Sequence, residues 1–243
     1  MDSTQKFDKE ILVRWIMDAA RRTITHYGFW FREVEYQLGL DQALEIEREA
    51  GDQSIGIQLK RLSKILGFEL KNGAPAALYD LGEEQLQTLL DAMAANWLAN
   101  DGVWFQAVEK RLGMHDAKRC NDTCWTRFSP LEASRIKAMV DLPENGGLPA
   151  LKTALKYRLY SVINIQEIVE EEPDSFVFRM VDCRVQSART RKGLPEYPCQ
   201  SAGVVEYRTF AQTIDPRIRT ECLGCPPDRH PEGWYCAWKF SLK

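Results

Sequence analysis

Apolar residues recur with a helical period through the first 160 residues of the chain. From Asp8 onward they fall at Ile11, Trp15, Ile16 and Ala19, which places them on one face of a helix. The same spacing predicts further helices over residues 57–66, 83–98 and 148–160. A long N-terminal part built from helices is therefore expected.

A helix start is predicted at Ser129. Serine is a residue type that caps helices, and Pro130 suits the first helical position. Glu132 stands where a capping box needs its acidic residue.

The hydrophobic period changes after residue 160. Val and Ile are frequent over 160–170, and residues 176–185 alternate in part between apolar and polar, which is typical of strands. Residues 199–214 predict a helix that Pro216 ends. Two more strands are expected over residues 217–224 and 234–242, around a loop rich in Pro and Gly.

Together these patterns predict an α+β protein. An N-terminal helical bundle is expected over residues 1–155, and a cysteine-rich domain with a small antiparallel sheet and helices over residues 156–243. The boundary near residue 155 follows the change of period.

An internal repeat joins residues 28–43 and residues 102–117. Gly, Trp, Phe, Val, Glu, Leu, Gly and Ala match without a gap, which indicates a duplicated helix-turn-helix unit. The Trp-Phe pairs are expected in the core. Glu35 and Glu109 occupy equivalent positions and are candidates for facing each other and holding a substrate, a metal or a proton. The alternative is that each caps or ion-pairs with a neighbouring helix.

Composition narrows the classes of function. The chain has 243 residues, of which 44% are hydrophobic and 28% charged, as in ordinary globular proteins. The net charge of −3 supplies no positive field for nucleic acid. The polar N-terminus is unlike a signal peptide, and no apolar run of about 18 residues is present. We expect a cytoplasmic protein with no nucleic-acid or membrane partner.

Seven cysteines are the unusual feature, and none precedes Cys120. In a reducing compartment, metal ligands, reactive thiols and buried thiols are the alternatives to disulfides. If the last two strands pair, Cys222 and Cys236 fall roughly opposite each other. A four-thiolate site suits zinc or an iron–sulfur cluster. The candidate ligands are Cys183, Cys199, Cys222, Cys225 and Cys236.

The remaining thiols and one histidine are given simpler roles. Cys120 and Cys124 lie four residues apart on a predicted helix and are expected to be small buried residues. His230, between two prolines, is either a ligand or acid–base group or a residue of a surface loop.

A short basic cluster lies between Cys183 and Cys199. It contains Arg184, Arg189, Arg191 and Lys192, and it is a candidate site for a carboxylate or phosphate. The alternative is a solvated surface. The cluster has no interleaved aromatic residues, so it is not typical of nucleic-acid binding.

The C-terminal part has Cys183 after an apolar strand, followed by short motifs over residues 193–199, 219–222 and 236–240. With these residues it resembles bacterial proteins related to L-2-amino-thiazoline-4-carboxylate hydrolase. Its ending is also similar to the 4-vinyl reductase-type small-molecule-binding domain. The whole chain, with its Trp-Phe-x-x-Val-Glu repeats, resembles a set of uncharacterised cytosolic proteins from anaerobic bacteria. It implies an α+β pocket for a small molecule with functional cysteines. An insertion over residues 225–231 departs from the pattern, so the hydrolase activity is not carried over.

The sequence thus predicts a metal- or thiol-dependent protein that acts on a small anionic molecule. Hydrolysis of a C–N bond is one version, which the resemblance to the thiazoline hydrolase implies. Its catalytic residues would be Glu221 and Cys236, with the arginines, Glu35 and Glu109 around the substrate. The alternative is a non-enzymatic sensor of a small molecule or of redox state, with zinc or an iron–sulfur cluster held by cysteines. A third hypothesis is a purely structural metal.

Overall fold

The chain forms two compact units in the computed structural model, which describes residues 7–242. Unit 1 comprises residues 1–61 and unit 2 comprises residues 62–243. This division differs from the predicted boundary near residue 155. The change from helices to strands does begin after residue 155, but the helices that precede it pack against the helices and sheet that follow. The change from helices to strands therefore lies near residue 155, whereas the boundary between the compact units lies at residue 61.

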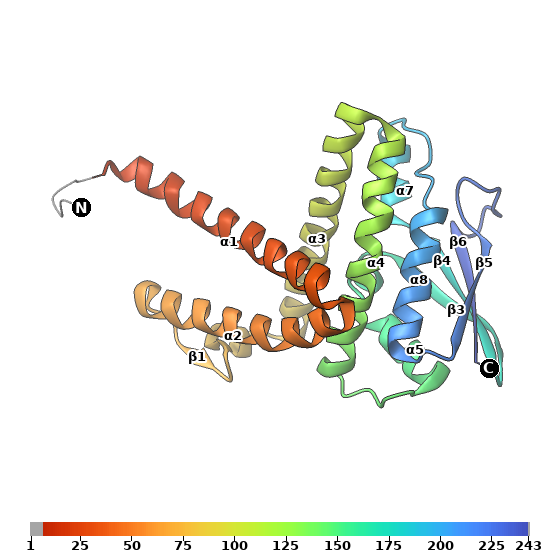
Figure 1. The fold of residues 1–243 in the computed structure, drawn as a ribbon, viewed down its shortest axis with the longest axis horizontal. Coiled ribbons are helices and arrows are strands. Elements are labelled where there is room, and N and C mark those ends of the chain that lie inside the picture. The colour runs from red at the N-terminus through yellow and green to blue at the C-terminus, as the bar shows by residue number, and fades with distance from the viewer. Residues whose placement is uncertain (1–6, 243) are drawn as a thin grey trace. The chain divides into compact units, whose positions relative to one another are not determined.

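Unit 1 is a pair of long helices joined by a tight turn (Figure 1). Helix α1 spans Lys9–Leu38, and helix α2 spans Leu40–Leu66, most of it within unit 1. The Asp8 side chain accepts a hydrogen bond from the Glu10 N–H and caps α1. Gly39 joins the helices with a φ of +88°, a conformation that favours glycine.

Unit 2 begins with the end of α2 and a small ribbon, followed by two long helices. The ribbon consists of β1 (Leu70–Lys71) and β2 (Ala74–Pro75), and a 3₁₀ turn, η1 (Ala76–Asp80), leads on to the helices. The helices of the unit are α3 (Glu83–Leu112), α4 (Met114–Met139), α5 (Gly147–Lys156), α6 (Leu159–Ile163), α7 (Arg184–Arg191) and α8 (Gln200–Ile214).

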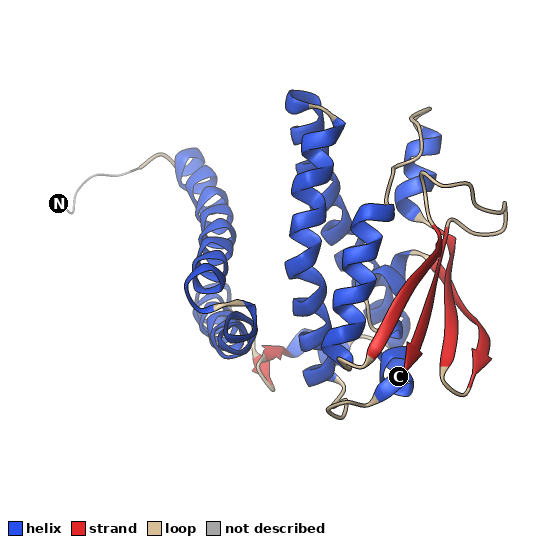
Figure 2. Cartoon of the chain, turned by 45° about the vertical axis from the view of Figure 1, so that its right-hand side comes forward, coloured by secondary structure: helices blue, strands red, loops and turns tan. Residues whose placement is uncertain are grey.

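A four-stranded antiparallel sheet closes unit 2, with the strand order β3-β4-β6-β5 (Figure 2). Its strands are β3 (Ile165–Glu172), β4 (Ser175–Asp182), β5 (Ile218–Gly224) and β6 (Cys236–Leu242). Strands β4 and β6 lie in the centre, and their inward residues Phe176, Phe178, Trp238 and Phe240 are buried. These residues form the core with α5 and α8.

Helix α8 lies against the sheet, and α4 packs on α8 (Figure 1). The indole of Trp238 approaches α8 at Gly203, where a Cβ atom would lie 2.6 Å from the ring. Glycine at this position therefore lets the helix and the sheet come close together. The observed architecture confirms the predicted α+β fold, with a helical N-terminal region and a small antiparallel sheet after it.

The repeat is visible as two equivalent helix pairs. Helices α1 and α3 have 30 residues each and begin 74 residues apart, which is also the spacing of the sequence repeat. Gly39 and Gly113 end them with φ values of +88° and +89°. The duplicated helix-turn-helix unit is thus the pair α1–α2 and its copy α3–α4.

The helix start predicted at Ser129 is wrong, because Pro130 lies inside α4. The helix continues through the proline since Trp125, Ser129, Ala133 and Ile136 form one buried stripe at helical spacing. Burial of this stripe offsets the hydrogen bond that proline cannot donate.

Two expectations about burial are also wrong. Cys120 and Cys124 are exposed on α4, beside the buried residues Asn121 and Trp125. Of the Trp-Phe pairs, Phe105 is buried, but Trp30 and Trp104 are exposed. None of the described helices combines the length and apolar character that crossing a bilayer requires.

Candidate functional site

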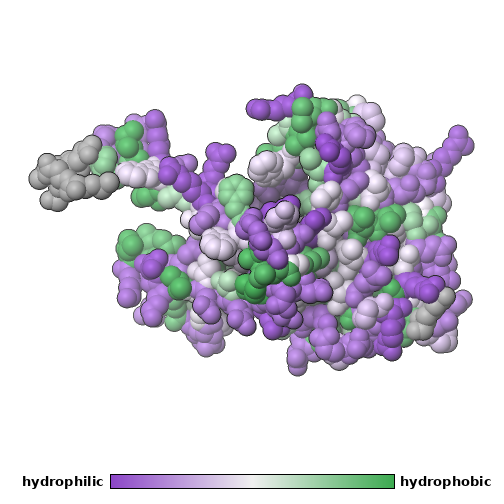
Figure 3. Space-filling model, in the orientation of Figure 1, coloured by the Kyte–Doolittle hydropathy of each residue, from purple (hydrophilic) through white to green (hydrophobic). Residues whose placement is uncertain are grey.

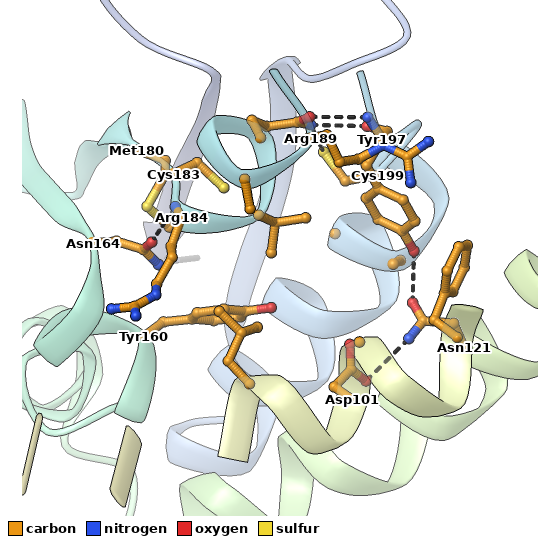
Figure 4. Close-up of a pocket in the computed structure, with 18 of the residues that line it drawn as sticks. Asp101, Asn121, Tyr160, Asn164, Met180, Cys183, Arg184, Arg189, Tyr197 and Cys199 are labelled. Carbon is orange, nitrogen blue, oxygen red and sulfur yellow. Dashed lines mark hydrogen bonds between the residues drawn. The ribbon is translucent and has the colours of Figure 1, made fainter. Parts of the chain in front are cut away.

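A cavity of about 470 Å³ lies in unit 2, between α3, α4, α7, α8 and the sheet (Figure 4). Its volume is typical of sites for small molecules. Much of its wall is apolar or aromatic: Leu98, Val103, Phe105, Trp125, Met180 and Trp238. In Figure 4, Tyr160 directs its hydroxyl across the cavity, toward the side on which Asp101 and Asn121 lie.

Four of the five predicted ligand cysteines line this cavity: Cys183, Cys199, Cys225 and Cys236. Each stands at the end of an element, before α7, at the N-cap of α8, after β5 and at the start of β6. The sulfur atoms of Cys199 and Cys225 are 3.4 Å apart. The fold thus brings together thiols that are separated by up to 53 positions in the sequence.

The predicted pairing of Cys222 with Cys236 is wrong. Cys222 lies opposite Trp238, and Cys236 lies opposite Met180 of β4. A register shift between Cys222 and Gly224 displaces the end of β5. Cys222 is nevertheless close enough to Cys225 for a hydrogen bond.

Cys225 sets the protonation of its neighbours. Hydrogen bonding with Cys199, Cys222 and Cys236 raises the pKa of Cys225, so this thiol stays protonated, and its single S–H donates to one of these sulfur atoms at a time. The same hydrogen bonding lowers the pKa of Cys199 and lowers that of Cys222 to about 7. Burial instead raises the pKa of Cys183 to about 12. Cys199 is therefore the wall thiol best suited to act as a thiolate.

No group of three or more His, Cys, Asp or Glu side chains has metal-holding geometry within residues 7–242. The proximity of the thiols supports their predicted convergence. The predicted zinc or iron–sulfur cluster stays a prediction.

A chain of hydrogen bonds forms the opposite wall. The Asn121 side chain donates to Asp101 at 3.2 Å, and the Tyr197 hydroxyl donates to Asn121 at 2.7 Å. Lys118 in turn donates to the Tyr197 hydroxyl at 2.9 Å. Burial raises the pKa of Asp101. This wall therefore presents a carboxyl group that takes up a proton more readily than an exposed aspartate.

A buried ion cluster lies behind the cavity. Arg158 is 1% exposed and contacts Glu132 at 2.8 Å and Glu206 at 2.7 Å. Glu206 also lines the cavity, and burial raises its pKa to about 7. A carboxyl group with this pKa exchanges protons near neutral pH.

The basic cluster is divided by the fold. Arg184, Arg189 and Lys192 line the cavity, whereas Arg191 is exposed outside it. Arg189 donates from Nε to the Pro195 carbonyl at 2.7 Å. Arg184 and Lys192 are exposed residues of the wall, so the side of the cavity formed by α7 carries positive charge.

The predicted glutamates lie apart from the thiols. Glu221 is exposed on β5 and does not line the cavity. Glu109 is 4.0 Å from Arg189, and Glu35 is 3.7 Å from Arg32 in unit 1. Their predicted facing across the bundle stays a prediction.

His230 lies on the loop between β5 and β6. Its Nε2 is 3.3 Å from Glu196. The ring also lies near Trp234 and Tyr235. Its side chain is 15% exposed, and its predicted role stays a prediction.

Two buried donors of the wall have no acceptor among the residues that the structure describes. They are the indole Nε1 of Trp238 and the side-chain Nδ2 of Asn164. Buried polar groups are nearly always satisfied by protein, water or ligand. Both donors therefore indicate a polar occupant.

Several residues of the site escaped the sequence reasoning. Asp101, Asn121, Glu132, Arg158 and Glu206 resemble ordinary surface residues in a charged helix. The repeat held a usable signal, because Asp101 and Asn121 stand where the first copy has Tyr27 and Glu47. Positions at which two copies differ in chemistry point to a function that one copy has acquired.

The chain belongs to a family of unknown function, DUF6125. The family model matches residues 5–82 and residues 79–242. These matches begin 74 residues apart, as the two copies of the repeat do. A search of curated proteins and a search of solved structures gave no match.

Proposed function

We propose that this chain is a cytoplasmic protein whose unit 2 cavity binds a small organic anion with an apolar body, in contact with Cys199. One observation carries the proposal: cations, thiols and an apolar wall converge on a single cavity of about 470 Å³. Such a combination of apolar surface with a few polar groups is characteristic of small-molecule sites.

The positions of the charges favour an anionic group on the ligand. Arg184 and Lys192 are exposed, so they attract an anion as it approaches. The donors of Asn164 and Trp238 have no acceptor within residues 7–242, and they provide hydrogen bonds for a carboxylate or carbonyl. Aromatic side chains such as Trp125 and Tyr160 provide the surface for the apolar part.

A second candidate is catalysis by the Cys199 thiolate. The hydrogen bond with Cys225 lowers the pKa of Cys199, and a thiolate is the reactive form of cysteine. Glu206, whose pKa is about 7, is a suitable proton carrier on the same cavity. Hydrolysis of a C–N bond is compatible with this pair of groups.

The binding proposal is tested with aromatic carboxylates and their matching amides, by calorimetry and thermal shift. We expect the carboxylates to raise the melting temperature and the amides to raise it less. Arg184→Gln is expected to weaken carboxylate binding about five-fold, an electrostatic effect of about 1 kcal/mol. Arg191→Gln, on the same helix but outside the cavity, is the matched control and should bind like the wild type.

Equal binding of amides and carboxylates would contradict the anion preference. Equal weakening by the two arginine substitutions would contradict the cavity as the site. Cys199→Ser separates binding from catalysis. The variant should still bind carboxylates, and if the protein is an enzyme that uses the Cys199 thiolate, the variant should lose its turnover.

A further inference from the structure

The helix pair of unit 1, called here the N-terminal hairpin (residues 9–61), has almost no core of its own. None of the described residues of α1 is buried, and Ala43 is the one buried residue of α2. Helix α4, which corresponds to α2 in the second copy of the repeat, has eight buried residues. Since helices in proteins are stabilised mainly by packing of an apolar face, the hairpin requires a partner.

Large apolar side chains cover the hairpin. On α1, six such residues are each at least 62% exposed: Ile16, Met17, Ile24, Phe29, Trp30 and Tyr36. Figure 3 shows hydrophobic residues between hydrophilic ones on the face of this hairpin that is in view. At helical spacing, Ile16, Met17, Ile24 and Trp30 share one side of α1, whereas Phe29 and Tyr36 lie on the other side.

Charge is distributed unevenly along the hairpin. The end that contains the Gly39 turn, residues 26–52, has seven acidic and two basic residues. The open end, residues 8–25 and 53–61, has six basic and three acidic residues. The two ends therefore carry net charges of opposite sign, −5 and +3.

We infer that the N-terminal hairpin pairs with the same hairpin of a second copy of this chain. In a two-fold, antiparallel arrangement, the basic open end of each hairpin lies on the acidic turn end of the other, which gives two equivalent contacts between opposite charges. The side of α1 that carries Ile16, Ile24 and Trp30 is buried against the same side of α1 in the second copy. A parallel arrangement would instead bring like charges together.

The first test is sedimentation of the full chain at low and high ionic strength. We expect a dimer whose dissociation constant rises with salt. Ile16→Glu with Ile24→Glu is expected to raise that constant at least 100-fold, since it places four carboxylates in the apolar interface. Met139→Glu with Ile165→Glu is the control, because these residues of unit 2 are 63% and 60% exposed. It should leave the dimer intact.

Charge reversal tests the orientation. Arg21→Glu with Arg22→Glu changes the open end, and Glu45→Lys with Glu49→Lys changes the turn end. Each pair should weaken the dimer about ten-fold, and all four together should restore it. Circular dichroism checks that each variant remains helical.

A monomer at every concentration overturns the inference, as does a dimer that survives Ile16→Glu with Ile24→Glu. Failure of the four-residue reversal to restore pairing overturns the antiparallel arrangement. Binding of small carboxylates by unit 2 is measured separately and does not depend on these outcomes.

Discussion

The two copies of the repeat share a scaffold and differ in what surrounds it. Both begin with a 30-residue helix and turn at a glycine with a φ near +88°. In the second copy, α4 packs against α8 and forms part of a cavity wall. The described residues of the first copy form almost no core. The same helix pair thus serves as a cavity wall in one place and as an exposed apolar surface in the other.

The copies also share an interhelical hydrogen bond with different chemistry. In the first copy, the Tyr27 hydroxyl donates to Glu47 at 2.8 Å. At the equivalent positions of the second copy, Asn121 donates to Asp101 at 3.2 Å. The bridge is retained, but the smaller side chains of the second copy leave space beside it, and both line the cavity.

The largest expected effect comes from giving the second copy a residue of the first. Trp125 packs on Trp97, Phe128 and Tyr160, and its equivalent in the first copy is Gly51. Trp125→Gly should lower the free energy of unfolding by about 4 kcal/mol or more, because it opens a cavity and adds a glycine to a helix. Chemical denaturation of the full chain, followed through the unfolding of unit 2, measures the change.

The matched control is Gly51→Ala in the first copy. Its new Cβ would meet only the flexible ends of Tyr27 and Glu47. A change within about 1 kcal/mol is expected. A cost of Trp125→Gly below about 1 kcal/mol would show that the aromatic cluster does not stabilise unit 2.

A smaller loss of stability is expected when Glu132 of the second copy is replaced by the residue at its equivalent position in the first copy. Glu132 holds the buried Arg158, and its equivalent is the exposed Gln58. Glu132→Gln should cost about 3 kcal/mol, since Arg158 keeps Glu206 as its sole carboxylate partner among those described.

Thermal and chemical denaturation at neutral pH check this value. Gln58→Glu, at an exposed position of α2, should change stability by less than about 0.5 kcal/mol. Equal effects of the two substitutions would contradict the difference in burial between the copies.

Local patterns predicted the elements, and packing decided the rest. The strands follow from alternation between neighbouring residues, and the repeat follows from matching residues in the two copies. Arg158 was missed because a buried arginine looks like a surface residue until Glu132 and Glu206 are placed around it. The facing of Cys222 and Cys236 failed because β5 and β6 pair in a register that places Cys222 opposite Trp238, and the pattern of the sequence does not reveal this register. The sequence named the other cysteines as candidates for one shared site, but it did not show which of them lie close together, since strand order cannot be read from one chain.

The smallest expected effect separates the thiols near the cavity from those on the repeat. Hydrogen bonding with Cys225 lowers the pKa of Cys222 to about 7, whereas burial raises the pKa of Cys124. The reactive thiolate of Cys222 should therefore be half formed near pH 7 and diminish below it. At pH 7 we expect Cys222 to be alkylated about ten-fold faster than Cys124, since a lower pKa also reduces intrinsic nucleophilicity.

Mass spectrometry of alkylated peptides over a range of pH measures both rates. Cys225→Ala removes the hydrogen-bond donor and should move the midpoint for Cys222 up toward the ordinary thiol pKa of about 8.5. An unchanged midpoint in this variant would show that Cys225 does not set the protonation of its neighbour. A shifted midpoint would extend the same reasoning to Cys199, whose lowered pKa has the same main cause.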